Sequence, residues 1–240
     1  MSYFCKRGLI IPDQHAPYHH PDTFPFLYKI KTIFGPFDRY INLGDETDGH
    51  AWSYHDSSPA LANSDLEFDR AKKFMKTMYE FTENECHVMK SNHGSLAYRK
   101  AKTGKIPSQI MRGAYERALE APPGWHWHNE FKVDTVRGPV NFIHGFSSVN
   151  TWAVAQKRGE SYVTGHHHTK FCLRQEYLPN IGKTIFAAQA GCLIDRTSEA
   201  FSYAATNGEK QKLGAMVLLD GIPIMIAMKT NSLDRWIGEL

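Results

Sequence analysis

Five short motifs, spread along the chain, contain most of the side chains that can bind a metal ion. They run in the order Asp13-Gln14-His15, Gly44-Asp45-Glu46-Thr47-Asp48, Ser91-Asn92-His93-Gly94, His144-Gly145 and Gly165-His166-His167-His168. Together they supply aspartate, asparagine and histidine side chains, which divalent transition metals accept as ligands. Each motif alone is a weak signal, and the five together predict a site for two adjacent divalent metal ions.

Two divalent metals about 3.5–4 Å apart can share a water molecule, lower its pKa and hold phosphate oxygens. One carboxylate must bridge them, because neighbouring cations repel each other, and we assign this bridge to Asp45. The other expected ligands are Asp13, His15 and His168 for one metal, and Asn92, His144 and His166 for the second. The predicted chemistry is therefore activation of water next to a phosphate group.

The predicted strands place the first three motifs at one edge of a sheet. The apolar runs 8–12, 39–43 and 86–90 are typical of buried strands, and each ends at a motif. Helical patterns over 23–34 and 64–82 alternate with these strands, and Ser64 with Glu67 predicts a capping box at the second helix. Such alternation indicates an α/β fold with parallel strands, whose carboxyl ends collect functional side chains.

In the rest of the chain, the sequence pattern changes from helical to strand-like. Residues 95–120 form a basic helical stretch that is broken at Gly104 and Pro107. Strands are then predicted at 125–136, 139–144, 161–164, 170–177, 183–190, 214–220 and 222–229, with a short helix around 149–158. Because no repeat, low-complexity tract or linker interrupts the pattern, we expect a single domain over residues 1–240.

The composition is that of a packed globular protein, with 42% hydrophobic residues. The 28 Lys and Arg residues nearly balance the 25 Asp and Glu residues, so charge does not by itself indicate a nucleic-acid binder. The four cysteines form no CxxC pair, which favours reduced thiols. No stretch approaches the roughly 18 apolar residues of a membrane span. We expect a soluble, cytoplasmic protein with no membrane partner.

The five motifs in this order resemble those of the calcineurin-like metallophosphoesterase superfamily, and the resemblance covers residues 13–168. It implies an α/β (α+β) fold of the metallo-dependent phosphatase type, a four-layer αββα sandwich of two mixed β-sheets flanked by helices. It carries the metal-ligand roles onto the seven residues assigned above. It also implies that His93 protonates the leaving oxygen or stabilises charge on it, and that Asp48 orients His93.

Two positions depart from the family's pattern. Family members usually have Asp or Glu after the Asn-His pair, where this chain has Gly94. The serine/threonine protein phosphatases continue the second motif with an arginine, where this chain has Gly49. The missing arginine argues against a protein phosphatase. The overall pattern is similar to that of small bacterial and phage phosphoesterases, including the repair-exonuclease branch.

The expected reaction is hydrolysis of a phosphate ester, in which a metal-bridging hydroxide attacks phosphorus and His93 assists the leaving group. The basic stretch and the missing arginine favour a phosphodiester, nucleic-acid or nucleotide substrate. A nucleotide or small-molecule phosphomonoesterase is the alternative. A metal-free protein-binding scaffold would predict missing ligands, whereas every ligand position is filled here. The mixed ligand set favours Mn²⁺, with Fe, Zn, Co or Ni as alternatives.

Four further residues follow the motifs closely enough to contact a substrate. His20 comes soon after the first motif and His50 soon after the second, so both are candidates for lining a cleft. Tyr98 and Arg99 follow the third motif, and such side chains can stack on bases. The alternative for Tyr98 and Arg99 is an ordinary solvated helix face.

Overall fold

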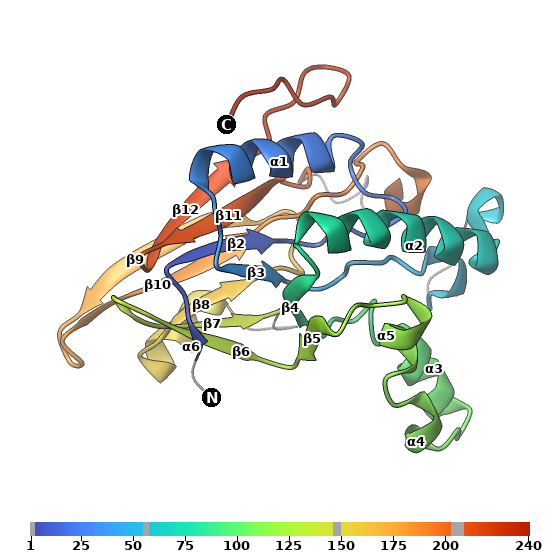
Figure 1. Cartoon of the computed structure of the whole chain (residues 1–240), viewed down its shortest axis with the longest axis horizontal. Coiled ribbons are helices and arrows are strands. Elements are labelled where there is room, and N and C mark those ends of the chain that lie inside the picture. The colour runs from blue at the N-terminus through green and yellow to red at the C-terminus, as the bar shows by residue number, and fades with distance from the viewer. Residues whose placement is uncertain (1–2, 55–57, 146–149, 203–208) are drawn as a thin grey trace.

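The computed structural model describes residues 3–54, 58–145, 150–202 and 209–240, and it contains two facing six-stranded sheets (Figure 1). In the first sheet the strand order is β12 (Ile222–Ala227), β11 (Gly214–Leu219), β2 (Arg7–Ile11), β3 (Arg39–Asn42), β4 (Glu85–Met89) and β5 (Gly124–His128). In the second sheet it is β1 (Tyr3–Phe4), β6 (Phe131–Thr135), β7 (Gly138–Ile143), β8 (Ser161–Thr164), β10 (Lys183–Ala190) and β9 (Phe171–Leu178).

Both sheets are mixed. Strands β2, β3, β4 and β5 pair in parallel, which confirms the parallel arrangement predicted for the first half of the chain, and β11 joins this group antiparallel to β2. In the second sheet β7 pairs in parallel with β8, and β8 with β10. The strand predicted over residues 125–136 is instead two strands in different sheets, because the chain turns between His128 and Phe131.

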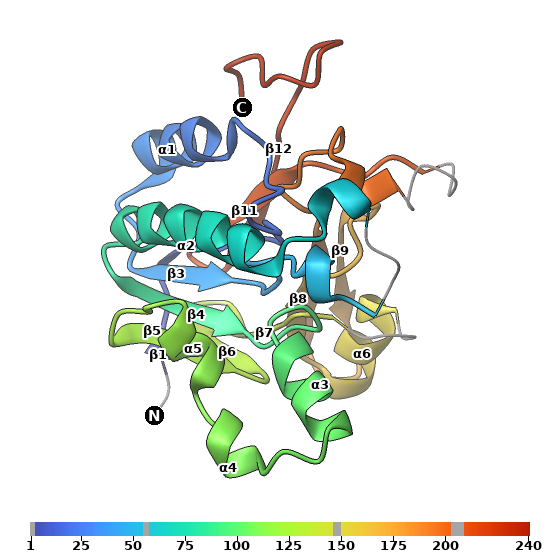
Figure 2. The ribbon, with the colours of Figure 1, turned by 90° about the vertical axis from the view of Figure 1, so that its right-hand side faces the viewer.

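Helices cover the outer faces of the two sheets, so the four-layer sandwich implied by the resemblance is confirmed. Helices α1 (Thr23–Phe34) and α2 (Ser64–Phe81) lie over the first sheet, and α6 (Thr151–Arg158) packs on the second (Figures 1 and 2). Strand β11 shows how the layers are filled: Val217 packs in the core under α1 and α2, whereas Met216 and Leu218 pack between the sheets. This alternation follows from the two-residue period of a strand.

The start of α2 differs from its prediction. Asn63, one residue before the predicted cap Ser64, is the N-cap, and its side chain accepts a hydrogen bond from the Leu66 backbone N–H at 3.0 Å. Glu67 does not close a capping box. Its carboxylate accepts hydrogen bonds from the backbone N–H groups of His50 and Ala51 at 2.8 and 2.7 Å. Asparagine caps as well as serine does, so either residue can begin the helix.

The broken helical stretch forms an arm of three short helices, α3 (Leu96–Thr103), α4 (Ser108–Met111) and α5 (Ala114–Ala118). The helix breaks at Gly104 and Pro107, as predicted, and the arm extends away from the strands β4 and β5 (Figure 2). Two 3₁₀ turns, η1 (His50–Trp52) and η2 (Pro59–Leu61), precede α2. The arm and these turns lie close to the loops that follow β3 and β4.

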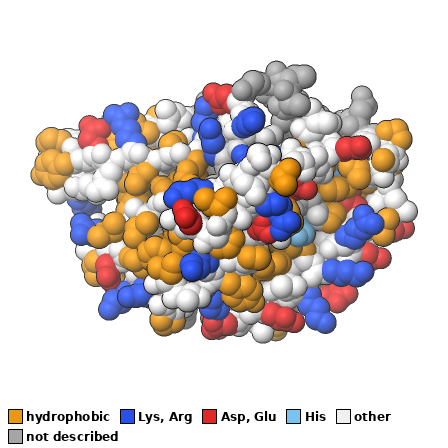
Figure 3. Space-filling model, turned by 90° about the horizontal axis from the view of Figure 1, so that it is seen from above, with side chains coloured by type: hydrophobic (Ala, Val, Ile, Leu, Met, Phe, Trp, Pro, Cys, Tyr) orange, Lys and Arg blue, Asp and Glu red, His pale blue; other side chains and the backbone are white. Residues whose placement is uncertain are grey.

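The face of the molecule seen from above carries hydrophobic side chains among Lys and Arg side chains (Figure 3). Tyr28 and Ile33 of α1 are half-exposed, whereas Phe26, Leu27 and Ile30 of the same helix are fully buried. The helix is therefore amphipathic, with its apolar face on the sheet. Within the described ranges, no helix is both long enough and apolar enough to cross a bilayer. All four cysteines are free thiols.

Candidate metal centre

The seven predicted metal ligands come together from loops at the ends of five strands. The first sheet contributes Asp13 and His15 after β2, Asp45 after β3, and Asn92 after β4; the second contributes His144 after β7, and His166 and His168 after β8. Residues up to 155 positions apart in the sequence thus meet at the edge where the two sheets face each other. Their ligand roles stay a prediction, whereas their proximity is a property of the fold.

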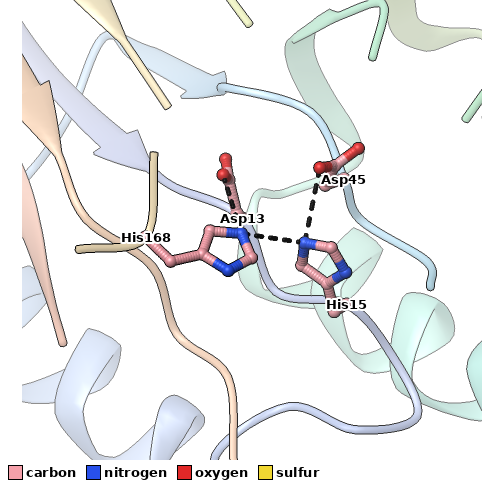
Figure 4. Close-up of side chains that lie close together, drawn as sticks. All are labelled: Asp13, His15, Asp45 and His168. Carbon is pink, nitrogen blue, oxygen red and sulfur yellow. Dashed lines mark hydrogen bonds and ion pairs between the residues drawn. The ribbon is translucent and has the colours of Figure 1, made fainter. Parts of the chain in front are cut away.

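The first group consists of Asp13, His15, Asp45 and His168, whose ligand atoms all lie within 4.8 Å of one another (Figure 4). His15 Nε2 lies 3.1 Å from His168 Nε2 and 3.3 Å from Asp45 Oδ2. His168 Nε2 lies 3.3 Å from Asp13 Oδ2. Two carboxylates and two imidazoles therefore face one small volume.

The second group consists of Asp45, His144 and His166, together with the Asn92 amide. His144 Nε2 lies 3.2 Å from Asp45 Oδ2 and 2.8 Å from Asn92 Oδ1. His166 Nδ1 lies 3.2 Å from both Asn92 Oδ1 and His144 Nε2. The same oxygen of Asp45 therefore faces both groups, as a bridging ligand must.

The donor set fits metal ions better than it fits hydrogen bonding alone. The facing nitrogens of His15 and His168 can share one N–H···N hydrogen bond or can both bind a cation, so this pair is compatible with either. Asp13 Oδ1 is buried and has no hydrogen-bond partner among the residues that the structure describes. Buried acceptors without a donor are costly, and a divalent cation at this position would satisfy them.

Hydrogen bonds on the far side of two rings fix which nitrogen faces the site. His15 Nδ1–H donates to Asp48 Oδ1 at 2.5 Å, and His144 Nδ1–H donates to the Leu43 carbonyl at 2.8 Å. Both Nε2 atoms are thereby directed toward Asp45. Contacts of this kind orient metal-binding histidines and raise their basicity.

Three of the predicted ligands have left-handed backbone conformations, which are uncommon for residues other than glycine. The φ angles are 52° at His15, 48° at Asp45 and 67° at His166. Such conformations cost about 1–3 kcal/mol each and are retained where the surrounding structure imposes them. The loops therefore hold these side chains in place before any ion binds.

His93 lies beside the first group and does not belong to the ligand pair around Asp45 Oδ2. Its ring Nδ1–H donates to the backbone carbonyl of Asp48, and its backbone N–H donates to Asp45 Oδ1 at 3.1 Å. The carboxylate of Asp48 lies farther away, with Oδ1 3.7 Å from His93 Nδ1. The structure thus places the carbonyl of Asp48, rather than its carboxylate, against His93, and places the carboxylate against His15.

The four weaker candidates have different surroundings. The Arg99 side chain donates to the Asn92 carbonyl at 2.7 Å and so holds a predicted ligand loop. Tyr98 is 46% exposed and lines a cavity in the arm. His20 is fully buried, and its two ring nitrogens bond to the backbone N–H of Asp22 and the carbonyl of Asp234.

His50 is buried at the start of η1, and its Nε2 accepts a hydrogen bond from the Ser58 backbone N–H at 3.1 Å. Of the four weaker candidates, Arg99 thus contacts a loop of the candidate metal centre, and Tyr98 lines the cavity. The hydrogen bonds described for the rings of His20 and His50 go to backbone groups outside the two ligand groups.

Two residues of the site were not anticipated from the sequence. Glu46 is buried directly after Asp45, accepts a hydrogen bond from the Trp127 indole N–H at 3.0 Å, and has its pKa raised by burial. The ring of Phe201 packs edge-on against His15, with ring centroids 5.6 Å apart. Phe201 comes from a segment without periodic pattern, and no spacing rule identifies it. Glu46 could have been noticed as an acid inside the second motif.

Metal binding at neutral pH should release about two protons per chain, because imidazoles bind metals through a deprotonated nitrogen. Burial lowers the pKa of His15, but hydrogen bonds to Asp45 and Asp48 outweigh it and raise the pKa to about 10. The pKa of His144 is likewise raised to about 9 by Asp45, against the effect of burial. Protons thus compete with the metal, and Mn²⁺ affinity should rise from pH 6 to pH 8.

Calorimetric titration of the metal-free protein with Mn²⁺ in PIPES and in Tris measures this release, because the two buffers have different ionisation enthalpies. A binding enthalpy that is the same in both buffers would contradict the expected proton release.

Gly165 provides the space for the Asp13 carboxylate. A Cβ atom at position 165 would overlap Asp13 Oδ1 and lie 3.2 Å from Oδ2. Gly165→Ala should therefore displace this carboxylate and weaken Mn²⁺ binding by about tenfold or more, with the fold retained. Gly104→Ala is the control, because a Cβ there meets its nearest neighbour at an ordinary 3.5 Å. Calorimetry and circular dichroism of both variants test this, and equal affinities would contradict it.

Comparison with known proteins gives matches only at the level of structure. No protein-family profile matches the chain, and no curated protein sequence matches it. Similar solved structures include an archaeal phosphodiesterase, at 12% identity and a TM-score of 0.48 over 92% of this chain and 99% of that one. Another is a metallophosphoesterase from Sphaerobacter thermophilus, at 13% identity and a TM-score of 0.46 over 95% and 90%. A third is YfcE, a phosphoesterase from E. coli, at 12% identity and a TM-score of 0.44 over 96% of each chain.

Proposed function

We propose that this chain is a calcineurin-like metallophosphoesterase that binds two divalent metal ions and hydrolyses phosphate esters. The observation that carries this proposal is the position of Asp45 Oδ2, 3.3 Å from His15 Nε2 and 3.2 Å from His144 Nε2. One carboxylate oxygen between two groups of nitrogen and oxygen ligands is the arrangement that a dinuclear site requires. Mn²⁺ suits this mixed ligand set.

Each residue has a distinct part in this proposal. Two bound cations would supply an activated water and would offset negative charge on phosphoryl oxygens. Asp45 holds the two ligand groups together, and Asp48 orients His15 through its carboxylate. His93 is held by the Asp48 carbonyl and gives a proton to the leaving oxygen.

We further propose a phosphodiester or nucleotide substrate. Gly49 follows Asp48 where protein phosphatases carry an arginine, so the chain lacks that phosphate-binding cation. The arm beside the site is basic, with Arg99, Lys100 and Arg112 among its residues. Both features favour a substrate with an organic group on each side of the phosphate, or a nucleotide, over a phosphorylated protein.

Paired chromogenic substrates test the proposal. In the presence of Mn²⁺, bis(p-nitrophenyl) phosphate should be hydrolysed faster than p-nitrophenyl phosphate. A faster reaction with the monoester would instead establish the phosphomonoesterase. No turnover of either ester by protein that contains metal would contradict the proposed enzyme.

A thermal melt distinguishes the proposed metalloenzyme from the alternative function, a metal-free protein-binding scaffold. Ions that bind only the folded state stabilise it by about 2.7 kcal/mol at a concentration 100 times the Kd. The melting temperature should therefore rise with Mn²⁺ and fall with chelator. A melting temperature unaffected by both would favour the scaffold.

A further inference from the structure

A cavity of about 660 Å³ lies between the ends of β4 and β5 and the arm of α3, α4 and α5. Its wall includes residues next to the candidate ligands in the sequence, among them Glu46, which follows Asp45. Ser91 and Gly94, which both line the cavity, directly flank Asn92 and His93 in the sequence. The Gly94 backbone N–H donates to Ser91 Oγ at 3.0 Å, so this loop is closed on itself at the cavity wall. The cavity is thus lined by the loop that carries the histidine proposed to protonate the leaving group.

The cavity wall contains aromatic side chains that hydrogen bonds hold in place. The Trp127 indole N–H donates to Glu46 Oε1 at 3.0 Å, and the Tyr115 hydroxyl is 2.8 Å from Thr47 Oγ1. The rings of Tyr115 and Trp127 meet edge to face, with centroids 6.5 Å apart and an interplanar angle of 83°. Tyr98 adds a third ring, which is 46% exposed. Rigid aromatic rings offer flat surfaces on which a planar ligand can stack.

The cavity also contains groups that can recognise the edge of a heterocycle. The amides of Gln109 and Asn129 line it, and each offers both donors and an acceptor. Amide side chains pair well with the donor and acceptor atoms of adenine. The volume lies in the range of about 300–1,000 Å³ that is usual for small-molecule sites. The combination of flat apolar rings and amides fits a nucleobase better than it fits a sugar or an alkyl chain.

Gly94, the residue after His93, lines the cavity without a side chain of its own. A Cβ atom on Gly94 would lie 3.1 Å from Ser91 Oγ, 3.5 Å from Tyr115 Cε1 and 3.7 Å from Glu46 Oε1. All three neighbours line the cavity, so any longer side chain at position 94 would extend into it. Gly94, one of the two residues that depart from the family's pattern, thus forms part of the cavity wall directly after His93 in the sequence.

We propose that the cavity binds the nucleobase of a substrate whose leaving group is a nucleoside. The inference rests on the proposed phosphoesterase function and names the leaving group for it. Water loses one proton to solvent and adds its oxygen to phosphorus, the bond from phosphorus to the nucleoside oxygen breaks, and that oxygen takes a proton from His93. The base, stacked in the aromatic cavity, would hold the leaving oxygen next to this histidine.

The test compares two ligands that differ only in the base. They are the 5′-methylenephosphonate analogues of adenosine monophosphate and of ribose 5-phosphate, in which carbon replaces the bridging oxygen so that neither is hydrolysed. Isothermal titration of the Mn²⁺-loaded protein should give at least about tenfold tighter binding of the adenosine compound, because stacking on an aromatic ring contributes this much. Equal affinity for the two compounds would overturn the proposal.

Substitutions in the cavity wall test whether the adenosine compound binds there. Tyr98→Ala should weaken binding of the adenosine compound by about fivefold or more, and Tyr98→Phe, which keeps the ring, should restore it. Gly94→Leu should reduce the preference for the adenosine compound, because its side chain would occupy part of the cavity. Tyr177→Ala is the matched control, because Tyr177 is 58% exposed on β9, at the opposite end of the molecule in Figure 1. An unchanged preference in both Tyr98→Ala and Gly94→Leu would overturn the proposal.

These measurements separate the two proposals. Binding needs no turnover, so the base preference is measured even if the chromogenic esters are not hydrolysed. Turnover of the esters without any base preference would support the phosphoesterase proposal and contradict only the proposed nucleobase site.

Discussion

Replacing Asp45 by asparagine should abolish activity and the pairing of two metal ions. One Asp45 oxygen faces His15 and His144, and the other accepts the His93 backbone N–H. An asparagine must turn its NH₂ group toward one of these sides, so it loses either the bridge or the bond to His93. Loss of several kcal/mol of transition-state stabilisation corresponds to a fall of at least about 10³-fold in kcat/KM.

Metal content after gel filtration, measured by mass spectrometry, should fall from two ions per chain to one or none in Asp45→Asn. Asp220→Asn is the control, because Asp220 occupies a left-handed hairpin position, with φ of 48°, that asparagine tolerates. If Asp45→Asn bound two ions and had an unchanged kcat/KM, the proposed bridging role of Asp45 would be contradicted.

Replacing His93 by alanine should separate chemistry from metal binding. The ring of His93 bonds to the Asp48 carbonyl and not to the oxygen of Asp45 that faces both ligand groups. Mn²⁺ affinity should therefore be nearly unchanged, whereas activity falls by about 10²–10⁴-fold, as expected for loss of a general acid.

The leaving group distinguishes proton donation from other roles of His93. An alkyl ester needs a proton on its leaving oxygen, whereas p-nitrophenolate leaves without one. The loss in His93→Ala should thus be much smaller with p-nitrophenyl esters than with alkyl esters. His126→Ala, an exposed histidine on β5, is the control. Loss of bound metal in His93→Ala, or an equal loss of rate on both esters, would contradict the assigned role.

The sequence predicted which side chains come together at the candidate metal centre, because each of them follows an apolar run. A buried parallel strand can be recognised from its run of apolar residues. Its carboxyl end must lie at the same edge of the sheet as the carboxyl ends of the neighbouring parallel strands. The strand pattern alone therefore places Asp13, Asp45 and Asn92 together. The four layers followed from the family resemblance, and the strand bounds of β2, β3 and β4 differ from their prediction by one residue.

Contacts that depend on loop conformation could not be predicted in this way. Asp48 was expected to orient His93; in the structure its backbone carbonyl accepts the His93 Nδ1–H, while its carboxylate accepts the His15 Nδ1–H. The bond from Arg99 to the Asn92 carbonyl and that from Trp127 to Glu46 also join separate elements. No periodicity encodes such contacts, because they arise only once the strands and the arm are packed.

The two sheets share the candidate metal centre, and this gives metal binding a mechanical consequence. Asp13, Asp45 and Asn92 belong to loops of one sheet, and His144 and His168 to loops of the other. Ions bound between them would act as non-covalent cross-links at one edge of the sandwich. Removal of metal should then loosen that edge first, so hydrogen exchange at the carboxyl ends of β3 and β7 would report occupancy of the site before the molecule unfolds.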